Sequence, residues 1–172
     1  LFRTLRRFWD MDAGGRPLLA LLCCLARDPL LRATAEPVLS LRVGEELSRQ
    51  RVLEAIREAT GSRLNESTID KVARNASSSW QQSGHLTGRV RKIRRQVRPT
   101  PDAVAYALLL GYLQGHRGSR LFDTEWTRVL DASPQELRQL AVDAKRFGCL
   151  DLKMAGEIVE IGFSGILTNE EI

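Results

Sequence analysis

The chain has few aromatic residues, few histidines and few cysteines. Aromatic residues make up 6% of its 172 residues, so it is poorly supplied with the rings on which single-stranded nucleic acids stack. The two histidines, His85 and His116, lie far from any cysteine or carboxylate pair at ligand spacing, which argues against a metal site. Three cysteines, two of them the adjacent Cys23 and Cys24, offer no disulfide framework. We therefore expect a reducing compartment, the cytoplasm.

Long apolar runs and catalytic motifs are also missing. The longest apolar run, residues 17–26, has about half of the roughly 20 residues that a membrane helix needs, and it predicts a core helix instead. The glycine-rich stretch at 111–120 lacks the Lys-Ser/Thr ending of a phosphate loop. The serines at 67–79 have no histidine at a suitable spacing. We expect no membrane partner, enzyme activity, cofactor or small-molecule substrate.

Acidic residues are absent from positions 71–101, which we call the basic block. It contains eight basic residues: Lys71, Arg74, Arg89, Arg91, Lys92, Arg94, Arg95 and Arg98. The chain has 26 basic and 21 acidic residues, so without these eight it would have 18 against 21. The net charge of +5 therefore arises in one segment. Such a local field attracts anionic partners, and the missing acids argue against a surface of internal ion pairs.

The first part of the basic block lies on a predicted helix over residues 67–84, capped by Asn65 or Ser67 and ended by Gly84. Trp80 belongs to its apolar face, with Ile69, Val72, Ala73 and Ala76, and is expected to anchor the core. The opposite face carries Lys71, Arg74, Asn75 and Ser78, which we expect to face the groove of double-stranded DNA. Asn75 is suited to adenine, while Arg89, Arg91, Lys92, Arg94, Arg95 and Arg98 would hold phosphates. Binding should be salt-sensitive and mostly independent of sequence.

The remaining periodicity predicts a mainly α protein. Helices are expected at residues 1–9, 17–26, 45–60, 103–113, 123–130 and 133–148, followed by a β-hairpin from 149–153 and 157–163. The pattern of a capped helix followed by an extended segment occurs twice, at 67–86 and 133–150. It predicts a helical bundle with helix-turn-helix or winged-helix-like parts.

We place the division between residues 1–98 and 99–172, which could also form one compact domain. Residues 121–172 hold ten acids and five bases. The second helix and hairpin are thus expected to serve packing or protein contact rather than DNA binding.

Several short motifs are shared with a known family. They are residues 63–69 (RLNESTI), Ala73-Arg74, Trp80, residues 105–112 (AYALLLGY), Gly115-His116-Arg117-Gly118, Leu121-Phe122, Trp126 and Gly148-Cys149-Leu150. From about Leu39 onward the chain resembles the BrxA family of BREX phage-defence systems. The resemblance implies a small, mainly helical, cytoplasmic bacterial protein that has helix-turn-helix-like parts, binds double-stranded DNA and has no known catalysis.

The expected function is therefore that of a DNA-binding accessory protein that supports larger enzymes of a defence system. Two alternatives remain open at the level of sequence. The basic block could bind an acidic protein partner, in which case the affinity of the chain for duplex DNA would be low at moderate salt. The chain could also be a transcriptional regulator or an RNA binder, and a regulator would strongly prefer one DNA sequence.

Overall fold

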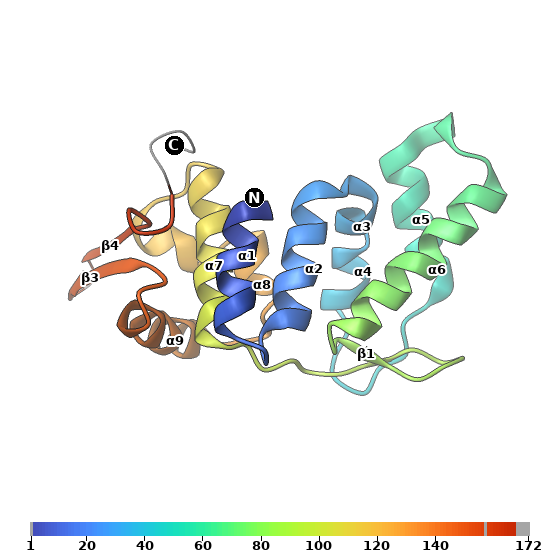
Figure 1. The fold of residues 1–172 in the computed structure, drawn as a ribbon. Coiled ribbons are helices and arrows are strands. Elements are labelled where there is room, and N and C mark those ends of the chain that lie inside the picture. The colour runs from blue at the N-terminus through green and yellow to red at the C-terminus, as the bar shows by residue number, and fades with distance from the viewer. Residues whose placement is uncertain (1, 157, 168–172) are drawn as a thin grey trace. The chain divides into compact units, whose positions relative to one another are not determined.

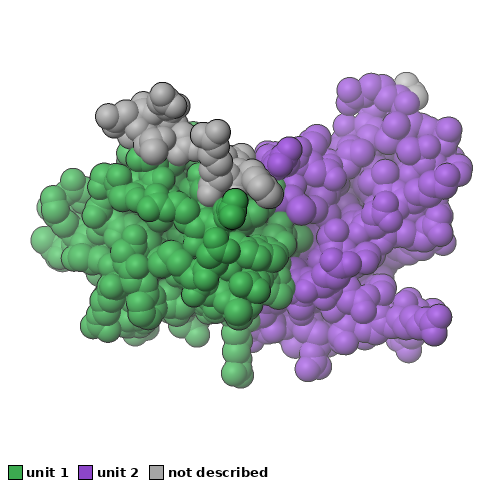
Figure 2. Space-filling model, in the orientation of Figure 1, with its two compact units in different colours: residues 1–23, 98–172 green, residues 24–97 purple. Residues whose placement is uncertain are grey.

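The computed structural model describes residues 2–156 and 158–167, and this part of the chain is mainly helical (Figure 1). It forms two compact units (Figure 2). Unit 1 comprises Leu1–Cys23 and Arg98–Ile172, and unit 2 comprises Cys24–Val97. The units divide after residues 23 and 97, so the first 23 residues group with the C-terminal part rather than with residues 24–97.

Unit 1 is built around α7 (Pro101–Leu113), whose residues 102–111 are all buried. A helix that is apolar on all sides must be covered on all sides. α1 (Phe2–Met11), α8 (Glu125–Arg128) and α9 (Pro134–Arg146) pack against it. The N-terminal segment belongs to this unit because α1 buries Phe8, whose ring meets that of Tyr106 edge to face at 5.5 Å.

The C-terminal part of unit 1 confirms the predicted capping box and hairpin. At the start of α9, Ser133 and Glu136 each bond to the other's backbone N–H. β3 (Asp151–Ala155) and β4 (Ile158–Gly162) pair antiparallel, with Leu152 opposite Ile161. β4 also packs against the short 3-10 helix η2 (Gly118–Phe122). Residues 1 and 157, which the predicted first helix and hairpin include, lie outside the described residues.

α2 (Arg16–Arg27) begins in unit 1 and ends in unit 2. It buries Leu19, Leu22 and Leu25, as expected of the predicted core helix. The further elements of unit 2 are α3 (Pro29–Ala33), α4 (Ala35–Leu39), α5 (Arg49–Thr60), η1 (Gly61–Arg63), α6 (Glu66–Gln82), β1 (Leu86–Thr87) and β2 (Ile93–Arg94). β1 and β2 pair antiparallel, with Thr87 opposite Ile93. The order α5, α6, β1, β2 parallels α8, α9, β3, β4 in unit 1.

The helix predicted over residues 45–60 begins only at Arg49. Residues 44–47 instead run beside β2, where Arg94 N donates to Glu45 O at 2.8 Å and Leu47 N donates to Lys92 O at 2.7 Å. These backbone bonds satisfy groups that a helix would have paired internally. The segment therefore adds a third extended chain to the small β1–β2 sheet.

The buried face of α6 holds unit 2 together. Ile69, Ala73, Ala76 and Trp80 are buried, as the sequence predicts. The Trp80 indole N–H donates to Thr34 Oγ1 at 2.8 Å, and its ring meets His85 edge to face at 5.0 Å. Because a buried indole N–H needs a partner, Trp80 fixes α6 against the start of α4 (Ala35–Leu39), which Thr34 caps.

Candidate nucleic-acid interface

The outer face of α6 carries the helix residues predicted to face a ligand. Lys71, Arg74, Asn75 and Ser78 are all exposed, and their spacing of three and four places them along one side of the helix. Asn65 Oδ1 caps the helix by accepting from Thr68 N at 2.9 Å. The helix thus offers two cations, an amide and a hydroxyl to solvent, backed by an apolar core.

The loop between β1 and β2 supplies the second group of cations. Arg89 and Arg91 are exposed, and Lys92 is half-buried. Lys92 Nζ donates to Gly88 O at 2.8 Å and to the side chain of Gln81 on α6. The loop is therefore tied to the C-terminal end of α6, so its cations are held beside that helix.

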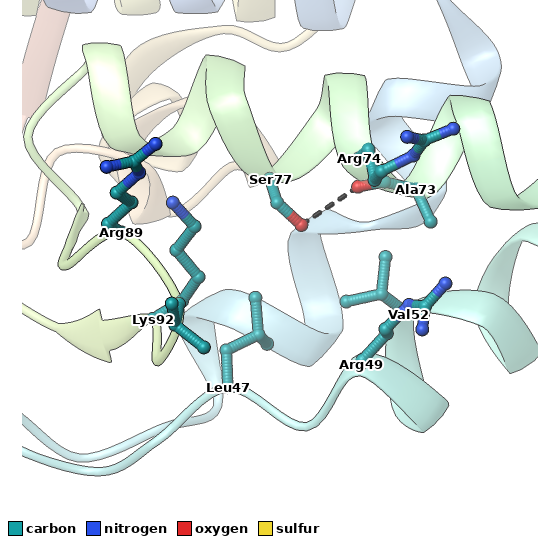
Figure 3. Close-up of a pocket in the computed structure, with 9 residues that line it drawn as sticks. Leu47, Arg49, Val52, Ala73, Arg74, Ser77, Arg89 and Lys92 are labelled. Atoms are coloured by element: carbon teal, nitrogen blue, oxygen red, sulfur yellow. Dashed lines mark hydrogen bonds between the residues drawn. The ribbon is translucent and has the colours of Figure 1, made fainter.

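A groove of about 340 Å³ lies between α6, the start of α5 and this loop (Figure 3). Four cations line it, together with a hydroxyl and several apolar side chains: Arg49, Arg74, Arg89, Lys92, Ser77, Leu47, Val52, Ala73 and Val90. Ser77 Oγ donates back to Ala73 O at 2.8 Å, which occupies its hydroxyl proton. A groove with cationic walls and an apolar floor matches a sugar-phosphate chain, which pairs anionic phosphates with less polar sugars.

Acidic residues from outside the basic block reach into this surface, contrary to the expectation of a face without ion pairs. Asp70 pairs with Arg49 and, at 3.5 Å, with Arg74. Glu46 accepts from Arg91 Nε at 2.7 Å, and this hydrogen bond raises the pKa of Arg91. A charge count confined to residues 71–101 misses both acids. Asp70 lies one position before the block on the same helix, and the pairing of residues 44–47 with β2 brings Glu46 there. Exposed pairs of this kind contribute little stability, so a phosphate can replace either carboxylate.

Three residues predicted to hold phosphates, Arg94, Arg95 and Arg98, lie outside the groove and in different environments. Arg94 is 3% exposed, and its guanidinium donates to Val38 O at 3.1 Å and to Arg95 O, so it supports the fold rather than a ligand. The prediction for Arg94 as a surface residue is wrong, because its side chain leaves the sheet on the inner face. Arg95 is exposed directly after β2. Arg98 is exposed but begins the second segment of unit 1, so we leave it out of the unit 2 surface.

Six of the nine residues that line the groove were not predicted as site residues, and Arg49 and Val90 are two of them. Arg49, the first residue of α5, lies outside the basic block, and a count confined to that block cannot find it. Val90, which the predicted site did not include, is 89% exposed. Its position between Arg89 and Arg91 is the sequence signal that could have drawn attention to it.

Unit 1 contains a buried pair of polar side chains. Cys149 Sγ donates to Asp102 Oδ1 at 3.0 Å, and both residues are buried. Within residues 2–156 and 158–167, no group of three potential ligand side chains is arranged to hold a metal ion. None of the helices in the same ranges combines the length and apolar character of a membrane span.

Comparison of the chain with protein-family models, curated proteins and solved structures finds no match.

Proposed function

We propose that the protein is a non-enzymatic, double-stranded DNA-binding accessory factor, and that unit 2 is its DNA-binding module. The observation that carries the proposal is the exposed face of α6, with Lys71, Arg74, Asn75 and Ser78, beside a groove lined by four cations. An α-helix fits the major groove of B-DNA, and cations on either side of it can neutralise phosphates.

The order of elements in unit 2 supports a winged helix-turn-helix assignment. Two short helices, an extended segment, α5, α6 and a β-hairpin follow one another, and the extended segment pairs with the second hairpin strand. In that arrangement α6 is the recognition helix and the β1–β2 loop is the wing. Unit 1 repeats the helix and hairpin, but its helix α9 begins with Glu136 in a capping box and belongs to the acid-rich part of the chain.

The burial of tryptophan favours duplex over single-stranded nucleic acid as the partner. Trp80 is the one Phe, Tyr or Trp among residues 24–97 and is 0% exposed, so unit 2 has no such ring available for stacking on bases. Backbone contacts by arginine and lysine, by contrast, require no exposed ring. A single-stranded competitor is therefore expected to displace a labelled duplex poorly.

Titration of a labelled duplex by fluorescence anisotropy at about 50 and 200 mM salt tests the proposal. A variant with Lys71, Arg74, Arg89 and Arg95 changed to Ala removes four exposed cations of unit 2. We expect the magnitude of the slope of log affinity against log salt to fall by roughly 3.6, since each of the four lost cations contributes about 0.9. Thermal unfolding should match the parent chain.

A matched control changes four exposed cations of unit 1, Arg138, Lys145, Arg146 and Lys153, to Ala. This variant loses the same formal charge but should bind the duplex with nearly the parental salt slope. Equal slopes for the parent chain and the unit 2 variant would refute the proposal. Weak duplex affinity of the parent at moderate salt, with tight binding to an acidic protein, would favour the adaptor alternative instead.

The defence setting of the proposal derives from the resemblance to the BrxA family. Its test is complementation in a bacterium whose BREX system lacks its BrxA gene. The parent chain should restore resistance to phage plating, and the unit 2 variant should fail to do so at equal protein level. Equal restoration by both would separate the defence role from DNA binding.

A further inference from the structure

At one end of the groove a single carboxylate is shared between two arginines. Arg49 begins α5 and Arg74 lies on the exposed face of α6, and Figure 3 shows both side chains at the same end of the groove. Asp70, one turn before Arg74 on α6, meets both of them: its Oδ1 pairs with Arg49, and its Oδ2 lies 3.5 Å from Arg74 Nε. Two of the cations that line the groove thus share one anion of the same chain.

The exposure of these three side chains shows which of them an anionic ligand meets first. The side chains of Arg49 and Arg74 are 68% and 66% exposed, whereas that of Asp70 is 32% exposed. A guanidinium has five N–H donors, and its contact with one carboxylate oxygen needs only one or two of them. The carboxylate lies deeper and cannot diffuse away, because α6 carries it. An approaching anion therefore meets two arginines that already converge on one point.

From this geometry we infer that Arg49 and Arg74 form a subsite for one DNA phosphate, and that Asp70 occupies this subsite while DNA is absent. The inference rests on the proposed function and deepens it, because it names one contact and one restraint within the same surface. A phosphodiester group has two non-bridging oxygens, and a carboxylate likewise offers two oxygens to two donors. Asp70 therefore takes the place of a phosphate in the free protein and competes with phosphate whenever DNA binds.

The expected consequence is that Asp70 limits the affinity of unit 2 for DNA. A phosphate must displace a carboxylate that stays tethered beside the arginines, and the like charges of the two groups repel each other. The displaced carboxylate also attracts salt cations, so DNA binding releases fewer ions in total than the number of arginines suggests. Asp70 thus keeps DNA binding readily reversible, and the removal of its charge should strengthen binding.

Asp70→Asn tests the inference, because asparagine keeps the shape of the side chain and removes its charge. Titrated against the labelled duplex at about 50 mM salt, this variant should bind about tenfold more tightly than the parent chain. The gain should fall to about threefold at about 200 mM salt, since one further effective phosphate contact adds about 0.9 to the magnitude of the salt slope. Stopped-flow measurements should trace most of the gain to slower dissociation, as expected of a direct contact rather than of long-range attraction.

Glu66→Gln is the matched control, because it removes one charge from the same helix. Glu66 is exposed and pairs at 2.7 Å with Arg57, which does not line the groove. This variant should change duplex affinity by less than about twofold. A second control introduces Asp70→Asn into a chain whose Arg49 and Arg74 are both changed to Ala, where the gain in affinity should also stay below about twofold.

The inference is overturned if Asp70→Asn weakens duplex binding, because Asp70 would then only hold α5 and α6 together. It is also overturned if Asp70→Asn strengthens binding no more than Glu66→Gln does, or by the same factor when the two arginines are absent. Either result would indicate a general effect of net charge. Duplex binding by the parent chain with any of these results leaves the proposed function intact. Absence of duplex binding by the parent and by every variant would refute the proposed function itself, and the inference with it.

Discussion

Asp102 lies in the interior of unit 1, in the first turn of α7. Burial raises the pKa of its carboxyl group, the hydrogen bond from Cys149 opposes that rise, and the nearby carboxylate of Asp12 adds to it. The folded state thus holds this proton more tightly than the unfolded state. The stability that this group contributes is present below its unfolded pKa and is lost as pH rises through the raised folded value.

We therefore expect Asp102→Asn to raise the melting temperature at pH 7, where the parent chain must bury a charge. The difference should shrink as pH falls towards 4, because the parent carboxyl becomes protonated there. Differential scanning calorimetry at both pH values measures it. Asp123→Asn, at an exposed position, is the control and should change neither value. A stabilisation that stays constant with pH would contradict the assignment.

The three thiols should differ in reactivity. Burial and the hydrogen bond to Asp102 together raise the pKa of Cys149 to about 12. Cys23 is buried as well, whereas Cys24 is exposed. Because the thiolate is the reactive form, Ellman's reagent near pH 8 should modify one thiol per native chain and all three after unfolding. A Cys24→Ser variant should show no rapid reaction, and a second fast thiol in the parent chain would contradict this account.

At the scale of elements, the residues that stabilise α6 differ from the residues that α6 exposes to solvent. Asn65 caps its first turn through the bond to Thr68 N, and Glu66 is held by Arg57 at 2.7 Å, which lowers the pKa of Glu66. Asn75 stands on the exposed face, where its side chain caps nothing. Two asparagines on one helix thus have separate roles.

Asn65→Ala should lower the free energy of unfolding by about 1 kcal/mol, because Thr68 N loses its acceptor. Duplex affinity at 25 °C should change little, since most of the chain stays folded. Asn75→Ala should leave the free energy of unfolding within about 0.5 kcal/mol of the parent value and should weaken duplex binding. Urea unfolding and anisotropy, applied to both variants, decide the matter. Loss of binding with Asn65→Ala and not with Asn75→Ala would show that the outer face is not the interface.

At the scale of the whole molecule, the positive charge depends on arginine and lysine. His85 is buried, and His116 lies in unit 1 after α7, so neither belongs to the proposed interface. The two units both end in two helices followed by a β-hairpin but differ in charge, so this order of elements does not by itself make a DNA-binding surface.

Duplex affinity should therefore vary by less than about twofold between pH 6 and 8.5, a range in which lysine and arginine stay charged. Anisotropy titrations at constant ionic strength measure this. A histidine-dependent interface would instead lose affinity as pH rises through about 6.5. A marked fall over that interval, abolished by His116→Gln, would place the interface in unit 1.

Local patterns of the sequence determined the longer helices apart from the start of α5, the caps of α6 and α9, the hairpin of unit 1 and the inward position of Trp80, but not the short helices α3 and α4. Each predicted feature depends on residues a few positions apart, so spacing alone predicts it. The tertiary structure decided where residues 1–23 pack, that Arg94 is buried, and that Glu46 and Arg49 join the basic surface. These facts depend on contacts between distant segments, such as the pairing of residues 44–47 with β2, and a count of charges along the chain contains no information about them.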